Sequence, residues 1–163
     1  MRGIIAGQPV VLVSLAYRLG AFGFLAHLDW AKLQTRKGKY KAFVYYFDHP
    51  APTSPDGASH AAEIGYVFGN LGGWGSGTNP EDLGLSDLRS SYWVNFAKTG
   101  DLNGSGLPNW PAFTEPEMTA MCLSQEPAAR PLPNLEKLKA IDAYFAWRRE
   151  QAHTGAGEEH VRQ

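Results

Sequence analysis

The sequence has a single cysteine, Cys122, among its 163 residues, so it cannot form an intrachain disulfide. A zinc site built from several cysteines is excluded for the same reason. Neither sign of charge dominates, because 15 Lys and Arg residues stand against 16 Asp and Glu residues, a formal net charge of −1. This balance gives no electrostatic reason to expect nucleic acid or an anionic membrane as a partner.

The sequence also has no long apolar run. Its most apolar run, Val10–Ala16, is far shorter than the roughly 20 residues that a membrane span needs. A signal peptide is not indicated, since Arg2 is a lone basic residue and Gln8 and Pro9 interrupt the apolar stretch. We expect no transmembrane segment in this chain and a cytoplasmic location if it is translated as given.

Nothing in the sequence indicates a metal or a cofactor. The spacing His-Glu-x-x-His does not occur around His27, His49, His153 or His160. The glycine-rich stretch Gly69–Gly77 is not followed by the Lys-Ser/Thr pair of a phosphate-binding loop. We therefore expect neither a metal nor a cofactor.

Three runs predict β-strands. Val10–Ala16 is rich in β-branched residues and does not alternate with polar ones, as is typical of a strand covered on both faces in a parallel sheet. Ala42–Asp48 is aromatic and β-branched, and Met118–Leu123 is a third, shorter candidate. With helices between them, these strands predict an α/β fold.

Polar caps and apolar stripes predict the helices. The most clearly delimited one runs from Pro80 to Lys98, with Thr78 or Asn79 as N-cap and Gly100 just past its end. Its broadly apolar composition predicts cover on more than one side. Other helices are expected over Leu28–Arg36, over Ala61–Phe68, and after an Asn134 cap with Leu135, Leu138, Ile141, Tyr144 and Phe145 on one stripe.

The loops also carry recognisable features. Asp101–Phe113 predicts a structured loop anchored by Trp110 and Phe113, and its Asn103-Gly104-Ser105 fits the glycosylation pattern of secreted proteins. From Gln151 to Gln163 the chain becomes small, polar and charged, which predicts a disordered tail.

Four stretches together, in this order, resemble the type B carboxylesterases, the branch of the α/β-hydrolases that includes the cholinesterases. They are Tyr17–Leu25 (YRLGAFGFL), Ala58–Gly69 (ASHAAEIGYVFG), Trp93–Asp101 (WVNFAKTGD) and Leu107–Pro111 (LPNWP). The resemblance covers nearly all of Val10–Glu150. It implies a mostly parallel sheet wrapped by helices, a small carboxylic ester as substrate, and a serine–histidine–acid mechanism.

The sequence departs from that family in its central part. In the family, a glycine-rich oxyanion loop precedes the Tyr-Arg-Leu-Gly stretch, a Gly-Glu-Ser-Ala-Gly nucleophile elbow follows Phe-Gly-Phe-Leu, and the triad acid comes between elbow and histidine. Here no Gly-x-Ser-x-Gly occurs, and the two regions join directly near His27–Trp30. We expect residues 1–150 to form a truncated α/β-hydrolase remnant with a partial, mostly parallel sheet and flanking helices.

The resemblance assigns the triad histidine, the general base of the family, to His60. An imidazole pKa of about 6.5 suits a group that takes a proton from serine and returns it to the leaving alkoxide. Such a histidine still needs a nucleophile, an orienting carboxylate and donors for the oxyanion. We therefore expect weak activity or none.

Two neighbours of His60 are further candidates. Ser59 is a candidate substitute nucleophile because Gly57–Ala61 is the nearest approach to the elbow pattern, with Ala in the last position; its place after a proline-rich loop favours instead a hydroxyl that bonds nearby backbone. Glu63, three residues after His60, either orients the imidazole across one helical turn or is a structural acid buried beside the site. The resemblance favours the structural acid.

Two other interpretations compete with the hydrolase. A partial sheet leaves apolar strand edges open, which favours a homo-oligomer or a non-catalytic interaction piece. The join near His27–Trp30 is also compatible with a degenerate reading frame that has no selected role. Sequencing the parent DNA across these codons tests the last interpretation.

Overall fold

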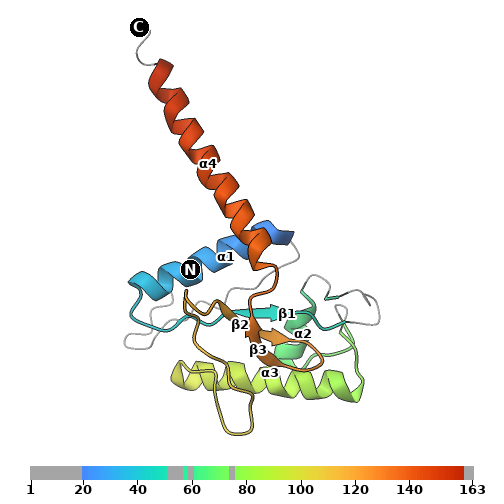
Figure 1. The fold of residues 1–163 in the computed structure, drawn as a ribbon. Helices are drawn as coiled ribbons and strands as arrows, with labels where there is room; N and C mark the ends of the chain where they lie inside the picture. Colours follow the sequence, from blue (N-terminus) through green and yellow to red (C-terminus); the bar gives the residue numbers. More distant parts are fainter. Residues whose placement is uncertain (1–19, 51–56, 59–60, 74–75, 160–163) are drawn as a thin grey trace.

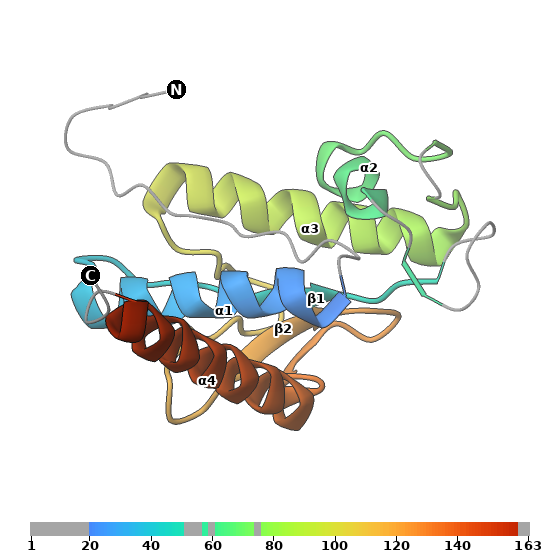
Figure 2. The same cartoon turned by 90° about the horizontal axis from the view of Figure 1, so that it is seen from above.

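A computed structural model describes residues 20–50, 57–58, 61–73 and 76–159. It contains the helices α1 (Gly20–Lys37), α2 (Ala62–Phe68), α3 (Pro80–Thr99) and α4 (Leu135–Glu159) and the strands β1 (Tyr45–Phe47), β2 (Thr119–Leu123) and β3 (Ala128–Pro131). The sheet lies between two helical layers, with α1 and α4 over one face and α3 over the other (Figures 1 and 2). The α/β prediction is thus confirmed.

Alternation along the strands explains the two layers. Phe43, Tyr45, Met121 and Leu123 point to the face that α3 covers, where they form a buried cluster with Tyr92 of α3. Ala42 and Ala120, each one position before a residue of the first face, point to the opposite face, where a second cluster includes Leu28 and Ala31 of α1 and Leu138 of α4. Each face of the small sheet therefore has its own core.

The described sheet is mixed, in the order β1-β2-β3. β1 pairs with β2 in parallel, with Tyr46 opposite Cys122, whereas β2 and β3 pair antiparallel. The expected parallel character thus holds for one of these two pairings. Val10–Ala16, the strand predicted for the sheet interior, lies outside the described residues.

The predicted short helix over Leu28–Arg36 is longer at both ends. α1 begins at Gly20 and ends at Lys37, so the position near His27–Trp30 where the sequence predicts a join falls inside one continuous helix. Among the α1 residues whose side chains are described, Leu28 and Ala31 are buried in the core. The sequence on both sides of the predicted join therefore contributes to a single element.

α3 has the boundaries that the sequence predicts, to within one residue. Asn79 is the N-cap: its side chain accepts the backbone N–H of Asp82, and the Asp82 side chain accepts the N–H of Asn79. Gly100 closes the helix in the left-handed region at φ 74°, where glycine carries no steric penalty. Of the two predicted caps, Asn79 is correct and Thr78 is not.

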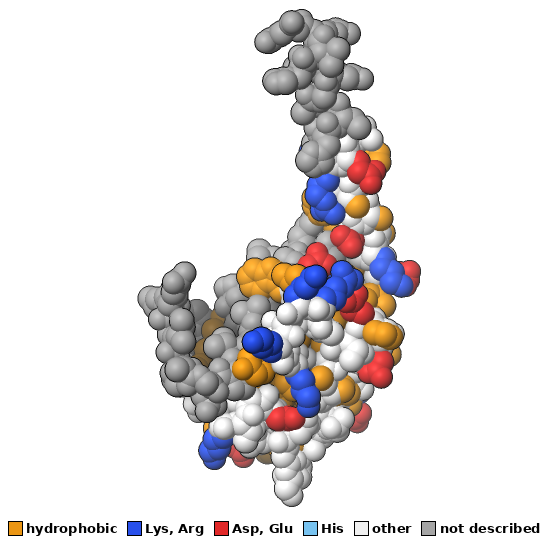
Figure 3. Space-filling view, turned by 90° about the vertical axis from the view of Figure 1, so that its left-hand side faces the viewer, with side chains coloured by type: hydrophobic (Ala, Val, Ile, Leu, Met, Phe, Trp, Pro, Cys, Tyr) orange, Lys and Arg blue, Asp and Glu red, His pale blue; other side chains and the backbone are white. Residues whose placement is uncertain are grey.

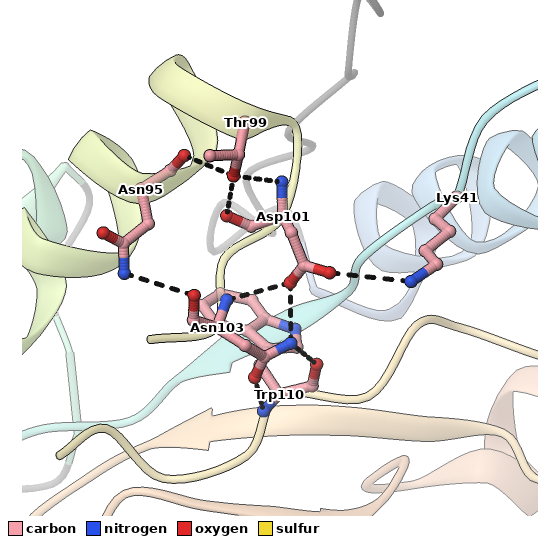
Figure 4. A network of polar contacts seen from close by, with 6 residues as sticks. All are labelled: Lys41, Asn95, Thr99, Asp101, Asn103 and Trp110. Atoms are coloured by element: carbon pink, nitrogen blue, oxygen red, sulfur yellow. Dashed lines mark hydrogen bonds and ion pairs between the residues drawn. The ribbon is translucent and has the colours of Figure 1, made fainter. Parts of the chain in front are cut away.

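The loop after α3 is fixed by the side chains of Asp101 and Asn103 (Figure 4). Asp101 accepts from the backbone and the amide of Asn103, and the Asn103 amide oxygen accepts the N–H of Trp110. Asn103 Nδ2 also donates to the Trp110 carbonyl. The nitrogen of the glycosylation pattern is thus used inside the fold, and Trp110 and Phe113 are buried anchors, as predicted.

The C-terminal part differs most from expectation. β3 was not predicted, because Ala-Ala-Arg-Pro has no alternating apolar pattern and ends in proline. Asn134 precedes α4 in the left-handed region, at φ 57°, and its carbonyl accepts the N–H of Leu138. α4 is helical as far as Glu159. It extends away from the body of the protein (Figure 1). The disordered tail expected from Gln151 onward stays a prediction.

Two properties of these described residues bear on function. None of their helices combines the length and the apolar character that crossing a membrane requires. They also contain no group of three or more His, Cys, Asp or Glu side chains arranged to hold a metal ion.

Candidate functional site

The structure describes one of the three predicted site residues. His60 and Ser59 lie outside the described residues, so their predicted roles stay predictions. Ala61, which follows His60 directly, is buried and has φ 63°, in the left-handed region that non-glycine residues rarely adopt. The chain therefore makes a sharp turn immediately before α2.

Glu63 is in the first turn of α2 and is only 8% exposed. Its charge acts on the guanidinium of Arg89, a residue of α3. A carboxylate buried near a cation fits the structural acid that the resemblance favours. The alternative, in which Glu63 orients His60, stays a prediction as well.

Arg89 is itself an unusual buried residue. Its guanidinium lies 4.7 Å from the ring centre of Phe47 and 5.3–5.4 Å from those of Trp93 and Tyr45. None of its three nitrogens makes a hydrogen bond of ordinary geometry to a described residue, although the Tyr45 hydroxyl is close enough to act on it as a hydrogen-bond partner. Burial lowers the pKa of Arg89, while Tyr45 and Glu63 oppose that shift. The guanidinium is thus stabilised mainly by cation–π contacts with three rings, where an arginine side chain usually has several hydrogen-bond acceptors.

A buried polar cluster of His49, Tyr66 and Asp82 lies beside α2. Asp82 Oδ1 accepts the hydroxyl of Tyr66 at 2.7 Å and is 2.9 Å from Nε2 of His49. Because an ionised carboxylate only accepts, Nε2 of His49 carries the proton. All three residues are buried, and Nδ1 of His49 has no hydrogen-bond partner among the described residues.

The charges of this cluster follow from its hydrogen bonds. Burial alone would raise the pKa of Asp82, but the bonds from Tyr66, His49 and the Asn79 N–H outweigh it, so the pKa lies below its ordinary value. Burial and the bond to Asp82 raise the pKa of Tyr66 well above its usual range. At neutral pH the cluster therefore combines a carboxylate with a neutral phenol.

Three residues of α3, each one turn after the previous one, form hydrogen bonds to α2. Asp82 binds the Tyr66 side chain, the Ser86 hydroxyl donates to the Tyr66 carbonyl at 2.8 Å, and the Ser90 hydroxyl donates to the Val67 carbonyl at 2.8 Å. This i, i+4, i+8 spacing puts all three on one face of α3. α3 thus has a polar face toward α2 and an apolar one toward the sheet.

The sequence does not single out this cluster. Asp82 is visible as an acid in the first turn of a helix, but His49 is 33 positions earlier and no spacing links the two. Only the folded chain brings them together. The signal that was available is the Asn-x-x-Asp capping pattern of Asn79 and Asp82.

Comparison with known sequences gives a consistent match. A sequence model of the Carboxylesterase family matches residues 28–141. Carboxylesterase 4A of Bos taurus is 40% identical over 83 residues, covering 48% of this chain and 15% of that protein. Carboxylesterase 1E of Rattus norvegicus is 32% identical over 117 residues, covering 70% and 18%. This chain thus spans less than a fifth of the length of these relatives.

Comparison with solved structures also finds esterases. A PNB esterase superposes with a TM-score of 0.59 at 32% identity, covering 69% of this chain and 23% of the other. A carboxylesterase of Geobacillus stearothermophilus gives 0.58 at 32% identity, covering 69% and 24%. The resemblance inferred from the four sequence stretches is confirmed by these matches.

Proposed function

Because this chain belongs to the carboxylesterase family, we propose that it is a carboxylic-ester hydrolase remnant that keeps the general base His60 and has weak activity or none alone. The observation that carries this proposal is the pairing of a His60-containing family motif with the absence of any Gly-x-Ser-x-Gly in the sequence. The substrate class is a small carboxylic ester.

The chemistry of ester cleavage explains the low expected rate. An isolated imidazole can activate water or, less readily, the neighbouring Ser59. It lacks an elbow serine, and losing even one oxyanion donor typically lowers the rate by about 10²–10³. The buried His49–Asp82 pair is no replacement, since Asp82 is already bound by Tyr66 and both side chains are closed to solvent.

Hydrolysis of a short activated ester tests the proposal. We expect wild type to exceed His60→Ala by no more than about tenfold, with Ser59→Ala close to wild type. A serine-directed organophosphate should leave the chain unlabelled. Rapid turnover that this reagent abolishes, with the label recovered on the polypeptide, would disprove the proposal. Hydrolysis above the uncatalysed rate that is equal in wild type and His60→Ala would show that His60 is not the group responsible.

A second candidate function is that of a non-catalytic interaction piece, including self-association. It is supported by large apolar side chains that stay exposed on α1 and α4, namely Trp30, Leu33, Tyr144 and Trp147. Figure 3 shows hydrophobic side chains among charged ones on the body and on the extended α4. Tyr144 belongs to the apolar stripe that the sequence predicts for the last helix, and it is half exposed.

Size-exclusion chromatography with light scattering tests this candidate. We expect a mass above that of one chain at micromolar concentration, and a shift toward one chain in Tyr144→Ser/Trp147→Ser. Lys137→Ser, an exposed change on the same helix, is the matched control. A wild-type chain that stays monomeric at every concentration contradicts self-association.

A further inference from the structure

Asn103 is the one asparagine of this sequence that is followed by glycine. In an open chain such a pair is prone to spontaneous deamidation, because glycine has no side chain to keep its backbone nitrogen away from the asparagine side chain. The Gly104 nitrogen bonds to Cγ of Asn103, and the side-chain nitrogen leaves as ammonia with the proton of the Gly104 N–H. Water then opens the cyclic imide at either carbonyl, which gives aspartate or isoaspartate.

In the folded chain the Asn103 amide is held at both of its ends (Figure 4). Nδ2 donates to Asp101 Oδ1 at 2.8 Å and to the Trp110 carbonyl at 2.9 Å. Oδ1 accepts the Trp110 N–H at 2.7 Å. The side chain is therefore paired with the backbone of Trp110 and, through Asp101, with its own loop.

This pairing is anchored in the core. Trp110 is 1% exposed, and its ring centre lies 6.0 Å from that of Tyr45 and 5.0 Å from that of Tyr92. Asn95 of α3 donates to the Asn103 carbonyl at 3.4 Å, so the peptide that would react is also held from α3. Gly104 itself is exposed. The attacking nitrogen thus belongs to a surface residue, whereas the amide that it attacks is tied to the core.

Deamidation requires Nδ2 to leave, and its bonds to Asp101 and Trp110 have to break for this to happen. The reaction therefore proceeds from states in which the loop has opened. Its rate in the folded chain follows the free energy of that local opening.

The product does not fit back into the closed loop. The bonds from Asn103 hold the pKa of Asp101 below its usual value, so Asp101 is ionised at neutral pH. A carboxylate at position 103 has no donor for Asp101 or for the Trp110 carbonyl, and it adds a like charge where Nδ2 was. In isoaspartate the backbone is also longer by a carbon atom.

We propose that Asn103 is a modification site, protected in the folded chain, that deamidates when the loop from Asp101 to Trp110 opens and then keeps this loop open. The reaction converts a transient opening into a permanent one. It needs only water and is independent of any esterase activity.

Peptide mapping of the full chain by mass spectrometry tests the protection. The chain is kept at mildly alkaline pH, either folded or in guanidinium chloride, and the mass gain that marks exchange of the Asn103 amide for a carboxyl group is followed. We expect the folded chain to react at least about tenfold more slowly than the unfolded chain. Asp101→Ala, which removes the acceptor of two Asn103 bonds, should raise the folded-state rate by about threefold or more. Lys41→Ala is the matched control, because it removes another partner of Asp101 and leaves Asn103 untouched.

Refolding tests the effect of the product with the wild-type sequence alone. Chains partly deamidated in guanidinium chloride are diluted, and those that regain the native elution position are separated by size-exclusion chromatography. We expect deamidated Asn103 to be about threefold or more depleted among them. The proposal is overturned if folded and unfolded wild type deamidate equally fast, if folded Asp101→Ala reacts no faster than wild type, or if deamidated and intact chains refold equally well. Two of these comparisons use no variant, so they decide the proposal even if Asp101→Ala does not fold.

Discussion

The two carboxylate oxygens of Asp82 accept hydrogen bonds from three separate parts of the chain. His49 comes from the end of β1, Tyr66 from α2, and the Asn79 N–H from the start of α3. Hydrogen bonds to a buried charge contribute about 1.5–3 kcal/mol each, so this one residue carries a substantial part of the local stability. It also makes that stability dependent on pH.

The first prediction is that Asp82→Asn lowers the free energy of unfolding most at neutral pH. The folded-state pKa of Asp82 is below its ordinary value, so the stabilisation is present above about pH 4 and is lost as the pH falls through the folded-state pKa. We expect a difference of about 2 kcal/mol at pH 7. Urea unfolding at several pH values should show this difference shrinking toward pH 3. Asp101, whose pKa is also lowered, titrates in both proteins and cancels. A difference that does not vary with pH would contradict the assignment.

The second prediction concerns Arg89. Three cation–π contacts stabilise the guanidinium by roughly 0.5–2 kcal/mol each. Burying an ion, by contrast, costs several kcal/mol, and each buried N–H without an acceptor costs about 1–3 kcal/mol more. These terms alone would favour replacing the arginine, but removing the cation also leaves the carboxylate of Glu63, only 8% exposed, without the opposite charge that faces it. Arg89→Met, which keeps the contacts with the rings, should therefore lower the free energy of unfolding by about 3 kcal/mol.

Arg89→Ala separates charge from packing in the same urea experiment. It removes the cation but leaves a cavity among Tyr45, Phe47 and Trp93, so it should be less stable than Arg89→Met by about 2 kcal/mol or more. If Arg89→Met is instead more stable than wild type, burying the guanidinium costs more free energy than its contacts with the rings and with Glu63 contribute.

At the scale of elements, α3 shows which features a sequence can predict. Its start and end depend on neighbours in the chain, Asn79 with Pro80 and Gly100, and both were predicted. Its burial pattern was predicted in part, since Leu85 and Tyr92 face the core but the sequence gives no sign that Arg89 does. Caps are local chemistry, whereas the environment of Arg89 is set by strands that lie far away in the sequence.

The third prediction tests the cap. Asn79→Ala removes the acceptor for the Asp82 N–H and should lower the free energy of unfolding by about 1 kcal/mol. Thr78→Ala changes the adjacent exposed residue, the alternative cap from the sequence, and should stay within about 0.5 kcal/mol of wild type. Equal losses in the two variants, measured by urea unfolding, would show that Thr78 shares the capping.

At the scale of the whole molecule, the family and the α/β architecture could be read from sequence, and the assembled site could not. The family stretches are local patterns, and three of the four lie within the residues 28–141 that the family model matches, so they identify the family without a structure. The His49–Asp82 contact spans 33 positions and depends on how α3 packs beside β1. β3 was missed because its pairing with β2, rather than its own composition, makes Ala128–Pro131 a strand.

The pairing of β3 also decides how its outer edge behaves. The Met121 N–H donates to the Val44 carbonyl, on the side of β1. Because successive residues of a strand direct their backbone groups to opposite sides, those of Ala120 and Cys122 point to β3, where their partners are Arg130 and Ala128. Ala129 and Pro131 then face outward, and proline has no N–H to offer. Within the described sheet, Ala129 is the one residue of this edge whose backbone N–H and C=O both point away from β2.

The fourth prediction is that any self-association does not use the β3 edge. Ala129→Pro removes its outward N–H without touching the bonds to β2, so the mass measured by light scattering should match wild type at every concentration. Ala129→Lys, which adds charge at the same edge, should behave alike. If instead both variants shift the chain toward a single copy, β3 forms the contact by strand addition, and the exposed side chains of α1 and α4 are not what brings two copies together.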